Sequence, residues 1–152
     1  VRNDLSRIAE PGSVTVPSLL RIEEHPTVVH LVSTVAANVA AGIGWAQSID
    51  STFPPGSVSG APKFTALQAI EELEPLSRGP YCGAIGVVDA DTSDATLAVG
   101  IRTFWLSGTP EAKTLHFGTG AGITWGSNPD SEWEESELKA RHLTSVASKE
   151  WA

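Results

Sequence analysis

The sequence predicts an α+β fold with a mostly antiparallel sheet and flanking helices. Three observations carry this prediction. Residues 27–39 are dense in β-branched side chains, which is typical of a long, mostly buried strand. Residues 90–94 (Ala-Asp-Thr-Ser-Asp) separate two apolar segments, as in a β-hairpin. A long helical segment runs from about Pro129 to Lys149 at the end of the chain.

The remaining elements are shorter and follow from breaker residues and apolar spacing. Glu10-Pro11-Gly12 ends the first helix, and Pro62 stands at the first position of a later one. Helices are predicted over 2–9, over 45–52, and from Pro62 to residues 73–76, where Pro75 interferes. Strands are predicted over 14–16, 19–23, 81–89, 95–106 and 115–117.

Length and composition restrict the class of protein. The 152 residues have the usual size of one domain, and the 18 acidic and 10 basic residues give a net charge of −8. No Lys/Arg cluster is present, so we expect no nucleic-acid partner. No apolar run approaches the roughly 20 residues that span a bilayer, so we expect no membrane contact. A single cysteine excludes an internal disulfide framework and suits a reducing cytoplasm.

The chain starts at Val1 rather than at a methionine and leads directly into Arg2-Asn3-Asp4. Two interpretations are open. The N-terminus is processed or trimmed, or the sequence is a piece of something longer.

The last helix places charged side chains on the face that should be packed. At about 100° per residue, Glu132, Glu135 and Lys139 fall within roughly 60° of one another, on the stripe that continues to Leu143. Buried charges are costly unless they are paired or bind an ion. Glu135 and Lys139 could form a simple i,i+4 pair at a frayed helix start. Alternatively, the carboxylates hold a hard cation such as Mg²⁺, and Lys139 meets an anionic ligand.

Three other features allow both a structural and a functional interpretation. Gly118-Thr119-Gly120-Ala121-Gly122 is a glycine-rich turn, or a segment whose N–H groups approach a carboxylate or phosphate. Its spacing does not match a dinucleotide-binding unit. Arg102, expected inside an apolar strand, either reaches solvent at a sheet edge or pairs with a carboxylate. His30 is either a satisfied core histidine or a catalytic group.

Seven stretches that cover nearly the whole chain recur in one order in a known family. They are Val1-Arg2-Asn3-Asp4-Leu5, HPTVVHLVSTV (25–35), FPPGSVSGAPK (53–63), ELEPLSRGPYCGAIG (72–86), Ile101-Arg102-Thr103, GAGI (120–123) and EWEESELKAR (132–141). Together they resemble the C-terminal part of the chorismate-utilising enzymes. The resemblance implies that residues 1–152 are the C-terminal portion of a chorismate-binding domain. In that family the fold is a large α/β sandwich built from a chain about three times this length.

The resemblance also implies roles for particular residues. Glu135 matches a glutamate that ligates Mg²⁺, and Glu132 matches an acidic neighbour that supports the ion. His30 matches a catalytic histidine beside the substrate ring. The residues that match substrate-binding groups are Ser57, Tyr81, Arg102, Gly120, Gly122 and Lys139.

Two details favour the aminodeoxychorismate synthases of folate biosynthesis within this family. Ser57 stands where anthranilate synthases usually have Thr. The segment Cys82-Gly83-Ala84-Ile85-Gly86 is similar to the aminodeoxychorismate synthases. The implied reaction is the Mg²⁺-dependent amination of chorismate, with a glutamine amidotransferase partner that supplies ammonia. Anthranilate synthase, isochorismate synthase and a non-catalytic binding module remain alternatives.

The family's first Mg²⁺ glutamate is expected upstream of Val1. We therefore expect residues 1–152 alone to lack synthase activity. They need the rest of the enzyme's chain as a partner, and by themselves they could form a homodimer through exposed strand edges.

Overall fold

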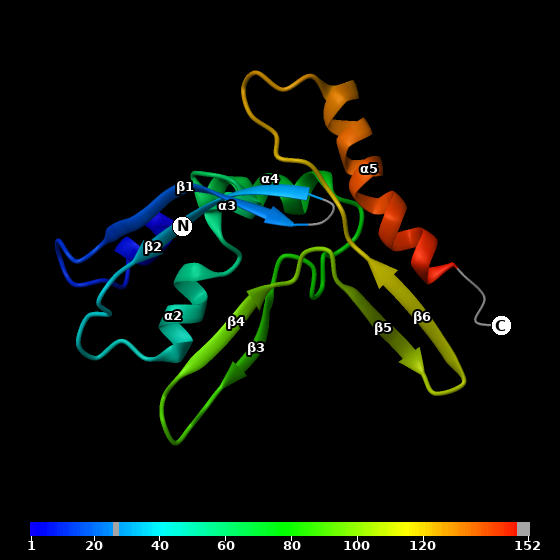
Figure 1. Ribbon diagram of the computed structural model, residues 1–152. Coiled ribbons are helices and arrows are strands. Elements are labelled where there is room, and N and C mark those ends of the chain that lie inside the picture. Colours follow the sequence, from blue (N-terminus) through cyan, green and yellow to red (C-terminus); the bar gives the residue numbers. More distant parts are fainter. Residues whose placement is uncertain (26–27, 149–152) are drawn as a thin grey trace. The chain divides into compact units, whose positions relative to one another are not determined.

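The computed structural model describes residues 1–25 and 28–148. The chain forms two compact units, Val1–Pro75 and Leu76–Ala152. Both units combine helices with antiparallel two-stranded sheets (Figure 1), which confirms the α+β prediction.

The first unit combines one long β-hairpin with four helices. Its strands are β1 (Thr15–His25) and β2 (Val28–Ala36), and its helices are α1 (Arg2–Ser6), α2 (Trp45–Thr52), α3 (Gly56–Ser59) and α4 (Lys63–Leu73). The sequence predicted two strands where β1 is one. Register shifts between Thr15, Ser18 and Arg21 explain the difference, because irregular pairing of this kind interrupts the alternation of side chains without ending the strand.

The helices of the first unit differ from the prediction mainly at their ends. Helix α2 has the predicted bounds. Helix α1 ends at Ser6, three residues early, because Ala9 forms a β-bridge with Val39 and the carbonyl of Ile8 accepts a hydrogen bond from the Ala40 amide. Helix α4 begins at Lys63, one residue later than predicted, so Pro62 is its N-cap rather than its first residue.

The second unit contains two hairpins and the C-terminal helix. Its elements are β3 (Ala84–Val88), β4 (Ala95–Val99), β5 (Phe104–Thr109), β6 (Ala112–Phe117) and α5 (Pro129–Ala147). The predicted hairpin turn at 90–94 is confirmed, with Val88 paired to Ala95. The side chain of Asp89 stabilises this turn by accepting hydrogen bonds from the amides of Asp91 (2.8 Å) and Thr92 (3.1 Å).

Two predicted strands of this unit were too long. Strand β3 starts at Ala84 rather than at residue 81, and the predicted strand 95–106 is divided into β4 and β5. Cys82 and Arg102 lie outside the observed strands and have φ angles of 67° and 51°, in the left-handed region that is uncommon for residues other than glycine. The prediction that Arg102 lies inside a strand is therefore wrong.

Helix α5 begins as predicted at Pro129, and the side chain of Asn128 accepts a hydrogen bond from the Ser131 amide at 3.1 Å. Its predicted end at Lys149 lies outside the described residues. No helix in the described part of the chain is long and apolar enough to cross a membrane.

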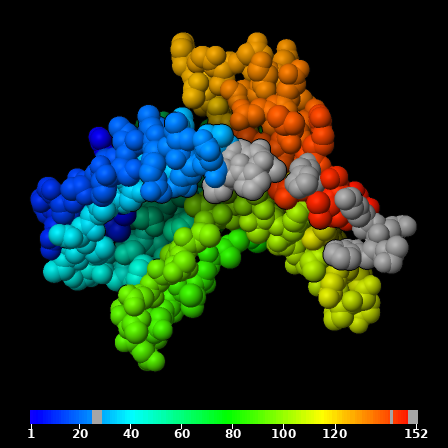
Figure 2. Space-filling model, viewed as in Figure 1, coloured from blue at the N-terminus to red at the C-terminus, as the bar shows by residue number. Residues whose placement is uncertain are grey.

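Few apolar side chains of the described residues are buried: Ile8 and Cys82 are. The prediction that residues 27–39 form a mostly buried strand is wrong for this structure, in which Val29 and Leu31 of β2 are 62% and 64% exposed. The reason is that β2 pairs with β1 alone. In the hairpin β3–β4, drawn in green in Figure 2, the side chains of Ile85 and Val87 are likewise exposed.

Candidate functional site

The second unit brings Tyr81 against the glycine run. A Cβ atom built on Gly118 would lie 2.4 Å from Cγ of Tyr81, and one built on Gly120 would lie 3.3 Å from the Tyr81 hydroxyl oxygen. The ring of Tyr81 therefore packs directly on the backbone of these glycines. The guanidinium of Arg78 lies 5.6 Å from the ring centroid, at cation–π distance.

Lys139 connects helix α5 to the same glycine run. Its Nζ donates to the carbonyl oxygen of Gly120 at 3.3 Å and lies 2.7 Å from Oε1 of Glu135. A further hydrogen bond of 3.2 Å runs from the Thr119 hydroxyl to the carbonyl of Ser136 in α5. Tyr81, Gly120 and Lys139, all predicted as substrate-binding residues, are thus brought together.

The i,i+4 ion pair between Glu135 and Lys139 is present, as expected from the first of the two interpretations of these charged residues. The hydrogen bond from Lys139, and then its charge, lower the pKa of the Glu135 carboxyl below its usual value. Glu135 is consequently ionised at neutral pH. Half of its side chain is exposed, which leaves oxygen surface available to a second cation.

Glu132 has a more specific environment. The hydroxyl of Ser127 donates to its Oε1 at 2.5 Å, and the Ser127 oxygen in turn accepts a hydrogen bond from the Thr124 amide at 2.9 Å. The other carboxylate oxygen, Oε2, is buried and has no hydrogen-bond partner among the described residues. Buried carboxylate oxygens are normally satisfied, so this oxygen is a candidate contact for a group that the described residues do not supply.

These residues fit a magnesium ion that also needs other ligands. No group of three or more His, Cys, Asp or Glu side chains that could hold a metal occurs within residues 1–25 and 28–148. Mg²⁺ is commonly held by one or two carboxylates together with waters and substrate oxygens. The unsatisfied Oε2 of Glu132 and the ionised Glu135 match such a partial site.

Two predicted residues of the second unit do not join this cluster. Arg102 lies in the bend between β4 and β5 and is exposed, and its side chain makes no hydrogen bond or ion pair within the described residues. Of its two interpretations, the one in which Arg102 reaches solvent agrees with this exposure, although Arg102 lies in a bend with a left-handed backbone rather than in an edge strand. A Cβ on Gly122 would meet nothing within 4 Å, so this glycine borders open space.

The other two predicted residues belong to the first unit. Ser57 lies in α3 with an exposed side chain. His30 is half-buried in β2, directly opposite Glu23 of β1.

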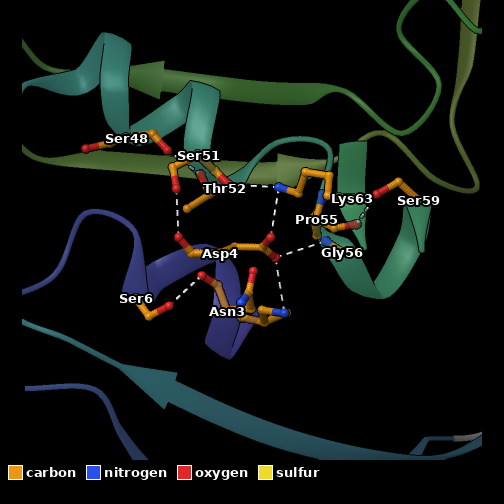
Figure 3. A network of polar contacts seen from close by, with 11 residues as sticks. Asn3, Asp4, Ser6, Ser48, Ser51, Thr52, Pro55, Gly56, Ser59 and Lys63 are labelled. Carbon is orange, nitrogen blue, oxygen red and sulfur yellow. Dashed lines mark hydrogen bonds and ion pairs between the residues drawn. The ribbon is translucent and has the colours of Figure 1, made fainter. Parts of the chain in front are cut away.

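Sequence reasoning missed a buried ionic cluster in the first unit (Figure 3). Asp4 of α1 has an exposed fraction of only 3%. Its Oδ1 lies 2.8 Å from Nζ of Lys63, and its Oδ2 accepts a hydrogen bond of 2.9 Å from the Gly56 amide. The available signal was that Asp4 and Lys63 each lie in a stretch that carries the family resemblance. Periodicity, however, cannot show that residues so far apart in the sequence form a pair.

We expect Gly118→Ala to displace the ring of Tyr81. The added methyl would have to occupy space within 3 Å of three ring atoms, and overpacking of this kind costs about 1–3 kcal/mol. Tyrosine fluorescence is obscured by the five tryptophans, so ¹³C-labelled tyrosine NMR is the suitable measurement. Gly126→Ala is the matched control, because a Cβ there meets nothing within 4 Å. An unshifted Tyr81 resonance in Gly118→Ala would contradict the described packing.

Comparison with solved structures identifies the architecture. The chain is similar to the crystal structure of anthranilate synthase component I from Streptococcus pneumoniae TIGR4, with a TM-score of 0.77 and 36% identity over 94% of this chain and 32% of that one. It also shares its fold with a putative 2,3-dihydroxybenzoate-specific isochorismate synthase from Bacillus anthracis, with a TM-score of 0.73 and 21% identity over 95% of this chain and 37% of that one.

Sequence comparison identifies the family. Residues 1–145 match the chorismate binding enzyme family, and the chain therefore belongs to it. It is 42% identical to anthranilate synthase component 1 of Saccharolobus solfataricus over 93% of its length, and 40% identical to that of Neisseria gonorrhoeae over 96%. These matches cover 32% and 29% of the relatives, so the chain spans about a third of their length.

Proposed function

We propose that this chain binds chorismate together with Mg²⁺ and forms part of the site at which chorismate is aminated. The observation that carries the proposal is the convergence of Tyr81, Gly120 and Lys139 in the unit that also holds the unsatisfied oxygen of Glu132. A dianionic substrate needs cationic and hydrogen-bonding groups, and these residues supply both.

Each group has a distinct task in this proposal. The Lys139 ammonium and the Tyr81 hydroxyl orient substrate carboxylates, and the exposed Arg102 is available for the same purpose. Glu132 and Glu135 would hold Mg²⁺, which when bound screens a carboxylate charge and acts as a Lewis acid. Ser57 and His30 contribute a hydroxyl and an imidazole beside the substrate ring.

Anthranilate formation is the reaction that the relatives support best, because they are anthranilate synthase components at about 40% identity. The aminodeoxychorismate reaction is the second candidate, and Ser57 and the Cys82–Gly86 segment are the features that favour it. Either reaction uses ammonia, and a glutamine amidotransferase is the partner that we propose to supply it.

The decisive experiment is calorimetric titration of the chain with chorismate, with and without MgCl₂. We expect saturable binding that is weaker without Mg²⁺ and that is weakened further by Lys139→Ala. Arg141→Ala is the matched control, since Arg141 is exposed on α5 and forms no ion pair within the described residues. Binding that is absent, or insensitive to Mg²⁺ and to Lys139, would overturn the proposal. Formation of aminodeoxychorismate by this chain alone would contradict our expectation that it is inactive by itself.

We expect Ser127→Ala to weaken Mg²⁺-dependent chorismate binding by about 10–100-fold, as is usual when a group that orients a metal-binding carboxylate is lost. The hydroxyl of Ser127 fixes Oε1 of Glu132 and thereby directs Oε2. Ser131→Ala on the first turn of α5 is the control, because its backbone amide bonds to the N-cap and its side chain forms no hydrogen bond within the described residues. Equal affinities for the wild type and Ser127→Ala would show that the Glu132 orientation is unimportant.

A further inference from the structure

We propose that Asp4, with Lys63, is a positioning residue that holds the segment carrying Ser57 in its binding conformation. This inference rests on the proposed function, in which Ser57 contacts chorismate. It adds two residues, from α1 and from the start of α4, to which the family resemblance assigned no role.

Asp4 of α1 is bonded to residues of α2, α3 and α4 (Figure 3). The carboxylate joins α1 to the start of α3 through the Gly56 amide at 2.9 Å, and to the start of α4 through Lys63 at 2.8 Å. The backbone carbonyl of Asp4 accepts a hydrogen bond of 2.7 Å from the Ser51 hydroxyl in α2. The α-amino group of Val1 also lies 3.1 Å from Oδ2.

Lys63 bonds to a second residue of the network besides Asp4. Its Nζ also donates to the carbonyl oxygen of Ser51 at 2.8 Å, so residues 51 and 63, which bound the Ser57 segment, are tied together. Only 11% of the Lys63 side chain is exposed. A cation at the first position of a helix opposes the helix dipole, and here the neighbouring carboxylate of Asp4 compensates for it. The ion pair is therefore built into this junction rather than added at the surface.

The Ser57 segment is hydrogen-bonded internally between these attachment points. The carbonyl oxygen of Pro55 accepts hydrogen bonds from the amides of Val58 and Ser59, both at 2.9 Å, and from the buried Ser59 hydroxyl at 3.1 Å. Gly56, held by Asp4, directly precedes Ser57. A carboxylate that fixes the Gly56 amide therefore fixes the position from which the exposed Ser57 side chain projects.

The test is a double-mutant cycle on chorismate affinity in the presence of Mg²⁺. We expect Asp4→Asn and Ser57→Ala each to weaken binding about tenfold, and the double variant to bind about as weakly as Ser57→Ala alone, because residues that act through one contact are not additive. Asp50→Asn is the matched control, since Asp50 is an exposed carboxylate of α2. Additive losses, or wild-type affinity in Asp4→Asn, would overturn the proposal.

Hydrogen exchange separates this inference from the proposed function, because it needs no ligand. We expect the Gly56 amide to lose part of its protection in Asp4→Asn, because an amide oxygen is a weaker acceptor than a carboxylate, and to keep it in Asp50→Asn and in Ser57→Ala. If the wild type fails to bind chorismate, the proposed function fails, whereas the exchange result still decides whether Asp4 holds Gly56. Unchanged protection in Asp4→Asn would refute the positioning role.

Lys63→Gln keeps the test decisive if Asp4→Asn does not fold. Glutamine retains a donor for the Ser51 carbonyl and for Asp4 but removes the charge. We expect chorismate binding to weaken about threefold in Lys63→Gln and not at all when the same change is made in the Ser57→Ala background. A threefold loss in both backgrounds would show that Lys63 acts independently of Ser57, against the proposal.

Discussion

Lys63→Met is expected to lower the free energy of unfolding by about 3–5 kcal/mol at neutral pH, the range found when one partner of a buried ion pair is removed. Methionine preserves most of the side-chain volume but leaves the Asp4 carboxylate, which is 3% exposed, without its closest cation. Urea unfolding followed by circular dichroism measures the change. Lys113→Met is the matched control, because Lys113 is exposed on β6 and forms no ion pair within the described residues.

The pH dependence of the stability difference between the wild type and Lys63→Met shows whether the ion pair causes it. Burial raises the pKa of Asp4, but the hydrogen bonds from Lys63, Gly56 and the chain's α-amino group, together with the Lys63 charge, outweigh burial, so that the pKa lies below its usual value. A carboxyl with a depressed pKa stabilises the fold above its unfolded-state pKa, about 4, and this stabilisation is lost as the pH falls through the folded-state pKa. The gap between wild type and Lys63→Met should therefore narrow below about pH 4. A gap that stays constant down to pH 2 would show that the ion pair is not its cause.

Local signals in the sequence predicted the elements whose ends are defined by local chemistry. Helix α5 begins at Pro129 after an Asn cap, and the β3–β4 turn is closed by Asp89, whose side chain bonds to amides two and three residues ahead. At two ordinary residues with a rare backbone conformation, the strand predictions failed. Cys82 and Arg102 have positive φ angles that nothing in their residue types indicates, so the strands around them were drawn too long.

The candidate site was likewise predictable only where its contacts are local in the sequence. The stripe of Glu132, Glu135 and Lys139 follows from helical periodicity, and the structure confirms the Glu135–Lys139 pair. Contacts between distant parts of the chain could not be predicted from spacing. The packing of Tyr81 on Gly118 and the ion pair of Asp4 with Lys63 join residues 37 and 59 positions apart, and only the folded backbone brings them together.

Glu135→Gln is expected to reduce the Mg²⁺-dependent affinity for chorismate by more than about 100-fold, beyond the range for groups that merely orient a metal ligand. An amide oxygen is a much weaker ligand for a hard cation than a carboxylate, and the low pKa of Glu135 shows that its carboxylate is the form present at neutral pH. Chorismate titration in 5 mM MgCl₂, taken as roughly a saturating concentration, measures the loss. Mn²⁺ binding, followed by electron paramagnetic resonance, provides a readout that is independent of chorismate.

The same titration without Mg²⁺ distinguishes a metal ligand from a partner of Lys139. Glu135→Gln removes the ion pair of 2.7 Å but leaves Lys139 its hydrogen bond to Gly120. If Glu135 holds the ion, the affinity measured without Mg²⁺ should change little, because only the metal contribution is lost. If Glu135 only orients Lys139, affinity should fall equally with and without Mg²⁺, and the metal assignment would be wrong. Glu137→Gln, an exposed carboxylate on the same helix, should behave as the wild type in both titrations and in Mn²⁺ binding.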